Sequence, residues 1–166
     1  MNDRVFNVLF ICTGNSARSI LAEGLLTHFG GGNFKAFSAG SHPSGTVNPL
    51  ALSTLRQLRV PAVGFRSKPW DEFALPDAPE LDFVLTVCDK AAGEVCPVWP
   101  GQPITAHWGV PDPAAVKGSE ELKTRAFMDT ALLLKRRIQL MLSLPLDKLA
   151  GLSLQHEIDR IGKTKA

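Results

Sequence analysis

A cysteine and an arginine enclose a short loop near the start of the sequence. Cys12 ends the apolar run 8–11, Arg18 follows six residues later, and a helical pattern begins at Ser19. The residues between them are small and mostly polar: Thr13, Gly14, Asn15, Ser16 and Ala17. A strand, a tight loop and a helix start direct backbone N–H groups at an anion, with the helix dipole behind them. Arginine adds a planar fork of donors that matches a tetrahedral oxyanion. The pattern therefore predicts an oxyanion site above a nucleophilic sulfur.

A plainer interpretation of the same residues is a buried cysteine that ends a strand, with Arg18 on the surface. Free cysteines are mostly inert core residues, and a cysteine six residues before an arginine is common by chance. The polar loop and the helix start make the surroundings of Cys12 electropositive, which is the setting of reactive thiols. We therefore favour the functional interpretation.

Two further reactive side chains follow predicted strands. Cys88 comes directly after the apolar segment 81–87, and Asp112 follows the short strand 104–108. In parallel sheets, ligands bind beyond the carboxyl ends of the strands. We therefore expect both side chains at the same edge of the sheet as Cys12. The alternative for Asp112 is structural, because Asp followed by Pro commonly starts a turn.

The elements that must position these groups alternate between strand and helix. We expect strands at 5–11, 34–38, 81–87 and 104–108, and helices at 19–29, 49–58, 120–142 and about 154–161. The buried face of the long helix is expected to hold Leu122, Phe127, Ala131, Leu134, Ile138 and Leu142. This alternation predicts an α/β fold with a four-stranded parallel sheet flanked by helices. The segment 89–101 carries Pro and Gly and is expected to be an irregular loop.

Composition limits the possible functions. The 166 residues suit a single domain, and a net charge of +2 is too small to indicate nucleic acid or an anionic membrane as partner. No apolar run approaches the ~20 residues of a membrane span. Three cysteines, an odd number, do not suggest a secreted disulfide framework. We expect a cytoplasmic protein with working thiols.

The stretch from Cys12 to Ser19 resembles the phosphate loop of the low-molecular-weight protein tyrosine phosphatases, and is still more similar to that of the arsenate reductases with the same fold. The resemblance covers residues 1–144 and leaves 145–166 as a C-terminal helix and tail, expected to dock on the same domain. It implies that Cys12 is the nucleophile and that the loop through Arg18 binds the oxyanion. It also implies that the Ser19 hydroxyl holds the thiolate, that Asn15 braces the loop in a left-handed conformation, and that Asp112 protonates the leaving oxygen.

The remaining cysteines favour the reductase branch. The segments around Cys88 and Cys96 look like the redox loop of the thioredoxin-coupled arsenate reductases, which implies a relay from Cys12 to Cys88 to Cys96. In the phosphatases, aromatic residues follow the Asp-Pro pair, whereas this chain continues with Ala114-Ala115 and has no tyrosine. Arsenate is then the substrate, with phosphate or sulfate as analogues. No bound cofactor is expected, and the external reductant is thioredoxin, or glutathione with glutaredoxin.

Two other functions remain open from the sequence. A phosphatase would use Cys12, Arg18 and Asp112 alone. A non-catalytic sensor would bind an oxyanion in the same loop and signal through a disulfide. Steady turnover with a thiol reductant would separate an enzyme from such a sensor.

Three residues match part of a potassium site found in some arsenate reductases, namely Asn15, Glu23 and Ser38. The remaining carboxylate of that site has no match in this sequence. Lys68, which lies near the corresponding position, is an alternative source of the positive charge.

Overall fold

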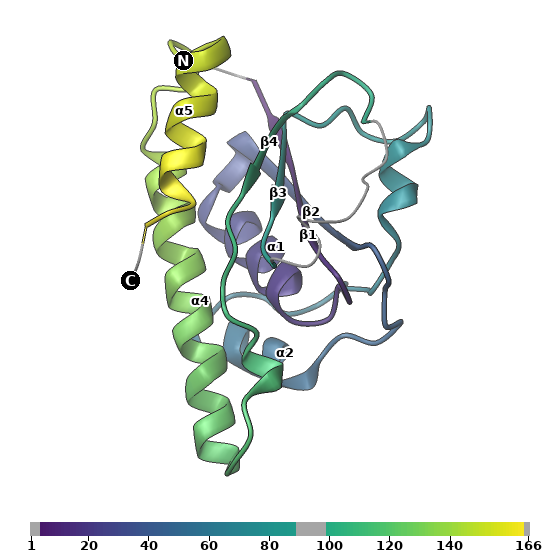
Figure 1. Ribbon diagram of the computed structural model, residues 1–166, viewed down its shortest axis with the longest axis vertical. Helices are drawn as coiled ribbons and strands as arrows, with labels where there is room; N and C mark the ends of the chain where they lie inside the picture. Colours follow the sequence, from purple (N-terminus) through teal and green to yellow (C-terminus); the bar gives the residue numbers. More distant parts are fainter. Residues whose placement is uncertain (1–3, 89–98, 165–166) are drawn as a thin grey trace.

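The computed structural model describes residues 4–88 and 99–164. Its centre is a sheet of four parallel strands in the order β2-β1-β3-β4 (Figure 1). The strands are β1 (Phe6–Cys12), β2 (Phe34–Gly40), β3 (Phe83–Thr86) and β4 (Ile104–His107). The predicted α/β fold with a four-stranded parallel sheet is thus confirmed. The third strand is shorter than the predicted segment 81–87, and most of the predicted loop 89–101 lies outside the described residues.

The helices begin and end close to the predicted residues. They are α1 (Arg18–Phe29), α2 (Pro49–Gln57), α4 (Glu120–Leu142) and α5 (Gly151–Ile161), with short 3-10 turns η1 (Gly31–Asn33), η2 (Trp70–Ala74) and η3 (Pro113–Ala115). Two starts have polar caps: the Asn48 side chain accepts a hydrogen bond from the backbone N–H of Leu50, and Ser119 accepts one from Leu122. Such caps satisfy N–H groups that have no partner within the helix.

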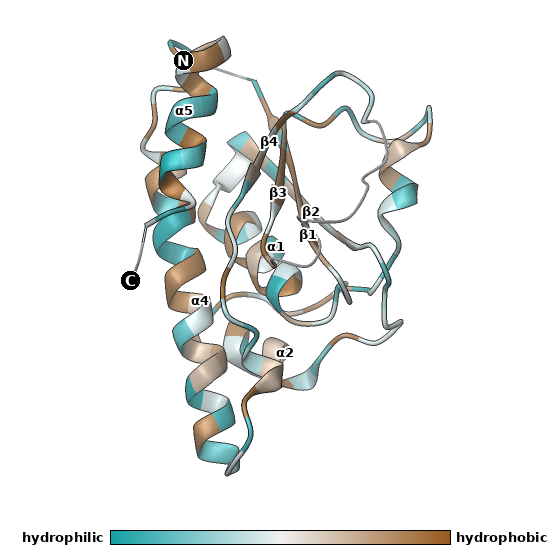
Figure 2. Cartoon of the chain, viewed as in Figure 1, coloured by the Kyte–Doolittle hydropathy of each residue, from teal (hydrophilic) through white to brown (hydrophobic). Residues whose placement is uncertain are grey.

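Both faces of the sheet are covered. Successive side chains of a strand point to opposite faces, and Ser38 of β2 donates a hydrogen bond to Glu23 of α1. The face that carries Ser38 and its register partner Phe10 therefore packs against α1. On the other face, the rings of Phe37 and Phe73 of η2 lie 5.5 Å apart. Coverage on both sides explains why β1 is apolar along nearly its whole length (Figure 2).

The buried side of α4 agrees with the prediction over most of its length. The predicted residues that are fully buried are Phe127, Ala131, Leu134 and Ile138. Leu122 was wrongly predicted to be buried: its side chain is 51% exposed. It lies in the first turn, which extends beyond the rest of the molecule (Figure 1). Near the end of the helix, Met141 is fully buried and Leu142 only half-buried.

The last helix, α5, lies alongside α4 and packs against β4 (Figure 1). Its apolar residues Leu154, Ile158 and Ile161 are buried. The indole N–H of Trp108, just after β4, donates to the Ile158 carbonyl at 2.9 Å. Within the described ranges, no helix combines the length and the apolar character needed to cross a membrane.

Two leucines of α4 provide a matched test of this packing. Leu134 is fully buried, whereas Leu132 is 44% exposed. We expect Leu134→Ala to lower the free energy of unfolding by about 2–5 kcal/mol, because it removes buried methyl groups and leaves a cavity. Leu132→Ala should change that free energy by about 1 kcal/mol or less. Urea unfolding of both variants measures the difference, and equal losses would contradict the orientation of α4.

Candidate active site

The loop after β1 is held from outside through its carbonyl groups. The carbonyls of Thr13, Gly14 and Ser16 each accept a hydrogen bond from a backbone N–H of the segment 41–48 at 2.9 Å, and the Gly14 carbonyl also accepts from the Ser67 hydroxyl at 3.1 Å. In a trans peptide, the N–H points opposite to the preceding carbonyl. The N–H groups that follow these carbonyls therefore face the inside of the loop. Such an array of donors is a cradle for an anion.

The thiol of Cys12 lies at the floor of this cradle. Its side chain is 3% exposed, and Sγ is 3.0 Å from the Ser19 hydroxyl oxygen. That oxygen accepts a hydrogen bond from the Asn15 side-chain amide at 2.8 Å. Asn15 donates to one lone pair of the Ser19 oxygen, so the hydroxyl hydrogen of Ser19 is available to donate to Cys12 when the sulfur is a thiolate. This arrangement suits a sulfur atom that carries negative charge.

Asn15 sets the path of the loop. Its backbone φ is 46°, in the left-handed region that asparagine adopts more readily than most residues. Its side-chain oxygen accepts the backbone N–H of Lys68 at 2.9 Å. Gly40, at the end of β2, lies against the same turn: a Cβ there would be 2.6 Å from the Thr13 carbonyl oxygen. The loop can approach β2 this closely because position 40 is glycine.

Arg18 and Asp112 form the rim. The Arg18 guanidinium donates to the Val110 carbonyl at 3.2 Å, and its other terminal nitrogen lies 3.7 Å from Asp112 Oδ2. The second oxygen, Oδ1, accepts the N–H of Ala114 and caps η3. The structural and functional interpretations of Asp112 are therefore compatible. A cavity of about 110 Å³ lies between these groups, lined by Cys12, Gly14, Ser16, Ala17, Arg18, Asp112 and Ala114.

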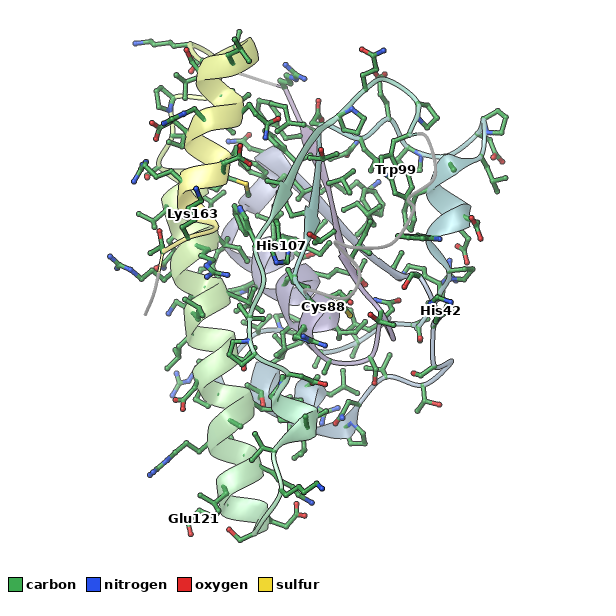
Figure 3. All side chains as sticks on the ribbon, viewed as in Figure 1. His42, Cys88, Trp99, His107, Glu121 and Lys163 are labelled. Atoms are coloured by element: carbon green, nitrogen blue, oxygen red, sulfur yellow. The ribbon has the colours of Figure 1, made fainter. Side chains whose placement is uncertain are left out.

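Cys88 lies beside the loop, as its place after β3 predicted (Figure 3). It is 1% exposed, and its Sγ is 3.3 Å from the backbone N of Thr13 and 3.4 Å from the Thr13 hydroxyl oxygen. The sulfur is thus directed at the residue after Cys12. Cys96 is outside the described residues, so its approach to Cys88 stays a prediction.

Three contributors to the site had only weak signals in the sequence. Ser67 and Val110 act from loops, one through its hydroxyl and the other through its backbone carbonyl. Gly40 supplies space rather than a functional group. A glycine that ends a strand beside a predicted anion loop is the one signal that could have indicated such a close approach.

The cluster behind the loop contains a buried lysine. Glu23 accepts a hydrogen bond from Ser38, and the Lys68 ammonium donates to the Arg66 carbonyl at 3.0 Å. Burial raises the pKa of Glu23, an effect opposed by the hydrogen bond from Ser38 and by the charge of Lys68. Burial also lowers the pKa of Lys68, opposed by the charge of Glu23. These contacts favour Lys68 as the cation of the cluster, because the Asn15 side-chain oxygen and one oxygen of Glu23 already accept protein donors. A potassium site here stays a prediction.

Comparison with known proteins places this arrangement in a family. The family model described as low molecular weight phosphotyrosine protein phosphatase matches residues 7–150. The arsenate reductase of Halalkalibacterium halodurans is 37% identical over 127 residues, which are 76% of this chain and 86% of the relative. That of Bacillus subtilis is 37% identical over 120 residues, 72% of this chain and 83% of the relative. A solved thioredoxin-dependent arsenate reductase of Corynebacterium glutamicum is 28% identical with a TM-score of 0.55, over 84% of this chain and 65% of its own.

The raised pKa of Glu23 predicts a pH-dependent stability. The native protein holds the Glu23 proton more tightly than the unfolded chain, whose pKa is near the ordinary 4.5. This contribution is fully present below that value and is lost as pH rises through the native pKa. We therefore expect the unfolding free energy of the wild type, relative to Glu23→Gln, to fall as pH rises above about 4.5. Urea titrations between about pH 4 and pH 8 measure it. The exposed Glu121→Gln is the control, and pH curves for Glu23→Gln that run parallel to the wild type would contradict the prediction.

Proposed function

This chain belongs to the low molecular weight phosphotyrosine protein phosphatase family, and we propose that it reduces arsenate to arsenite with Cys12 as the nucleophile. The observation that carries the proposal is the Cys12 sulfur with the Ser19 hydroxyl at 3.0 Å, below a small cavity rimmed by Arg18. Its support in sequence is the 37% identity to two arsenate reductases over more than two thirds of the chain.

The first step forms a bond between Cys12 and arsenic. Arsenate enters the cradle, where inward N–H groups and the Arg18 fork bind its oxygens. The Cys12 thiolate attacks arsenic, and one oxygen leaves as water after Asp112 donates a proton to it. Asp112 Oδ2 lies 3.7 Å from Arg18, so its carboxyl group stands at the mouth of the cavity. The product is a Cys12 thiol–arsenate adduct in which arsenic is still pentavalent.

The second step moves the electrons. The Cys88 thiolate attacks the Cys12 sulfur, the S–S bond forms, and the S–As bond breaks with its electron pair on arsenic, which leaves as arsenite. Cys88 follows β3, whose Thr86 is the register partner of Ile11. This offset on a neighbouring strand corresponds to Cα atoms about 6 Å apart, within the usual range of a disulfide. Cys88 must first turn its sulfur away from Thr13.

The third step restores the nucleophile. Cys96 attacks Cys88, so that Cys12 is freed and the Cys88–Cys96 disulfide is left for an external dithiol to reduce. The net reaction consumes arsenate and two thiols and yields arsenite, water and one disulfide. We propose thioredoxin as the reductant, supported by the thioredoxin-dependent enzyme of Corynebacterium glutamicum. Glutathione with glutaredoxin is the alternative donor.

A tyrosine phosphatase is the second candidate, because Cys12, Arg18 and Asp112 would serve phosphate equally well. The wall beyond Asp112 argues against it: Ala114 and Ala115 are both exposed and offer no ring to stack on a phosphotyrosine. The two activities can be compared on one preparation, by arsenite production with a thiol reductant and by aryl phosphate hydrolysis. Faster hydrolysis than reduction would favour the phosphatase.

Cys12→Ser tests the nucleophile. We expect it to abolish turnover in both assays, because a hydroxyl is a poor nucleophile at neutral pH. Binding of phosphate as an analogue, measured by calorimetry, should persist, since the cradle and Arg18 are unchanged. Arg18→Ala should lose binding as well as turnover. Turnover near the wild-type rate in Cys12→Ser would contradict the assignment of Cys12 as the nucleophile.

Cys96→Ser tests the relay. Given arsenate and no reductant, this variant should stop after one turnover with a Cys12–Cys88 disulfide, because neither earlier step uses Cys96. The wild type should finish with Cys88–Cys96 bonded and Cys12 free, and Cys88→Ser should release no stoichiometric arsenite. Peptide mapping by mass spectrometry distinguishes the three products. Reduced Cys88 and Cys96 in the wild type after arsenite has formed would show that an external thiol attacks the adduct directly.

A further inference from the structure

Arg137 of α4 is a buried cation that the reaction described above does not use. Its side chain is 4% exposed, and burial lowers its pKa. The guanidinium donates to the Trp108 carbonyl at 2.8 Å and to the Gly109 carbonyl at 3.0 Å. Nε and the second terminal nitrogen both donate to the Thr164 carbonyl, at 3.2 and 2.9 Å. Its hydrogen-bond partners among the described residues are thus three backbone carbonyls.

The first two carbonyls belong to the segment that leads into the site. Gly109 is followed directly by Val110, whose carbonyl accepts the Arg18 guanidinium and whose N–H donates to the Val87 carbonyl at 3.1 Å. Asp112 stands two residues further on, beside Arg18. A displacement of Gly109 would therefore move both groups that face Arg18 from this side.

The third carbonyl comes from beyond the region that the family model matches, which ends at residue 150. Residues 162–164 pack against the end of β4: a Cβ on Gly162 would overlap the His107 carbonyl and the Trp108 ring. In Figure 3, Lys163 and His107 lie near each other on this side of the molecule. The C-terminal segment thus closes the set of oxygens around the Arg137 guanidinium.

We propose that Arg137 is a positioning residue for the active site. Its planar fork, completed by the Thr164 carbonyl, fixes Trp108 and Gly109 so that the Val110 carbonyl and the Asp112 carboxyl group face Arg18. The inference rests on the proposed role of Asp112 as proton donor. Through the Thr164 carbonyl, the segment after α5 then contributes to the geometry of the active site.

The geometry of the fork explains why arginine is needed. Four N–H groups of one rigid plane reach two adjacent carbonyls on one side and Thr164 on the other. A lysine keeps the charge but is a single point donor on a flexible chain, so it cannot hold both segments at once. Arg137→Lys therefore removes the positioning of the two segments while it keeps the positive charge.

Activity in a double-mutant cycle tests the proposal. We expect Arg137→Lys to lower kcat about 10- to 100-fold, as for a catalytic group misplaced by about 1 Å. KM for arsenate should change less than kcat, because the loop carbonyls are anchored by residues 41–48 and Ser67, and only the Arg18 side of the cradle depends on Val110. In an Asp112→Asn background, Arg137→Lys should lower kcat no further, because the two residues act as one unit. Arg136→Lys, an exposed neighbour on α4, is the matched control.

Two results would overturn the proposal. Losses in kcat that multiply in the double variant would show that Arg137 does not act through Asp112. A lower unfolding free energy with kcat equal to that of Arg136→Lys would show a purely stabilising role.

Hydrogen exchange provides a readout that does not depend on arsenate reduction. In Arg137→Lys and in Gly162→Ala, exchange should rise in the peptide 106–112 and stay unchanged in the loop 12–18. Unchanged exchange at 106–112 would overturn the proposal even if the wild type reduces arsenate. Increased exchange in a protein that lacks reductase activity would instead mark failure of the proposed function.

Discussion

The left-handed turn at Asn15 is the constraint on which the site depends. It reverses the chain so that loop carbonyls point outward to residues 41–48 and loop N–H groups point inward. The same side chain donates to Ser19 and accepts from the backbone of Lys68, so one buried amide joins the loop, the start of α1 and the segment before η2. Without this turn, the Ser19 hydroxyl would lose the hydrogen bond from Asn15 that holds it against Cys12.

Local signals in the sequence predicted the elements well because each has a local cause. The glycines after α1, the Asn48-Pro49 pair and the Pro145 stop mark helix ends regardless of the rest of the fold. Leu122 shows what local signals cannot predict. Its spacing fits the buried face of α4, but its side chain is exposed because, within the described ranges, no other element covers the first turn of the helix. The spacing of apolar residues indicates which face of a helix is buried, but not how far along the helix the neighbouring elements extend.

The positions of reactive side chains at the site could be predicted from the sequence, whereas the contributions of backbone groups and of empty space could not. Cys12, Cys88 and Asp112 could be placed at one edge from the order of strands alone. Ser67 and Val110 act from loops whose path depends on tertiary packing, and Gly40 matters because of an atom it lacks. The buried Arg137 has no sequence signal, since arginine at a helical position usually faces solvent.

Two separate anchors hold the two halves of the site. The oxyanion cradle is fixed from the β2 side, by residues 41–48 and Ser67. Asp112 lies in the segment after β4, at the opposite edge of the sheet from β2. This segment also contains Gly109, whose carbonyl accepts from Arg137, and Arg137 in turn donates to Thr164 of the C-terminal segment. Arg18 links the two halves, because it lines the cavity above Cys12 and donates to the Val110 carbonyl, so a shift of the Asp112 segment also changes the surroundings of this arginine.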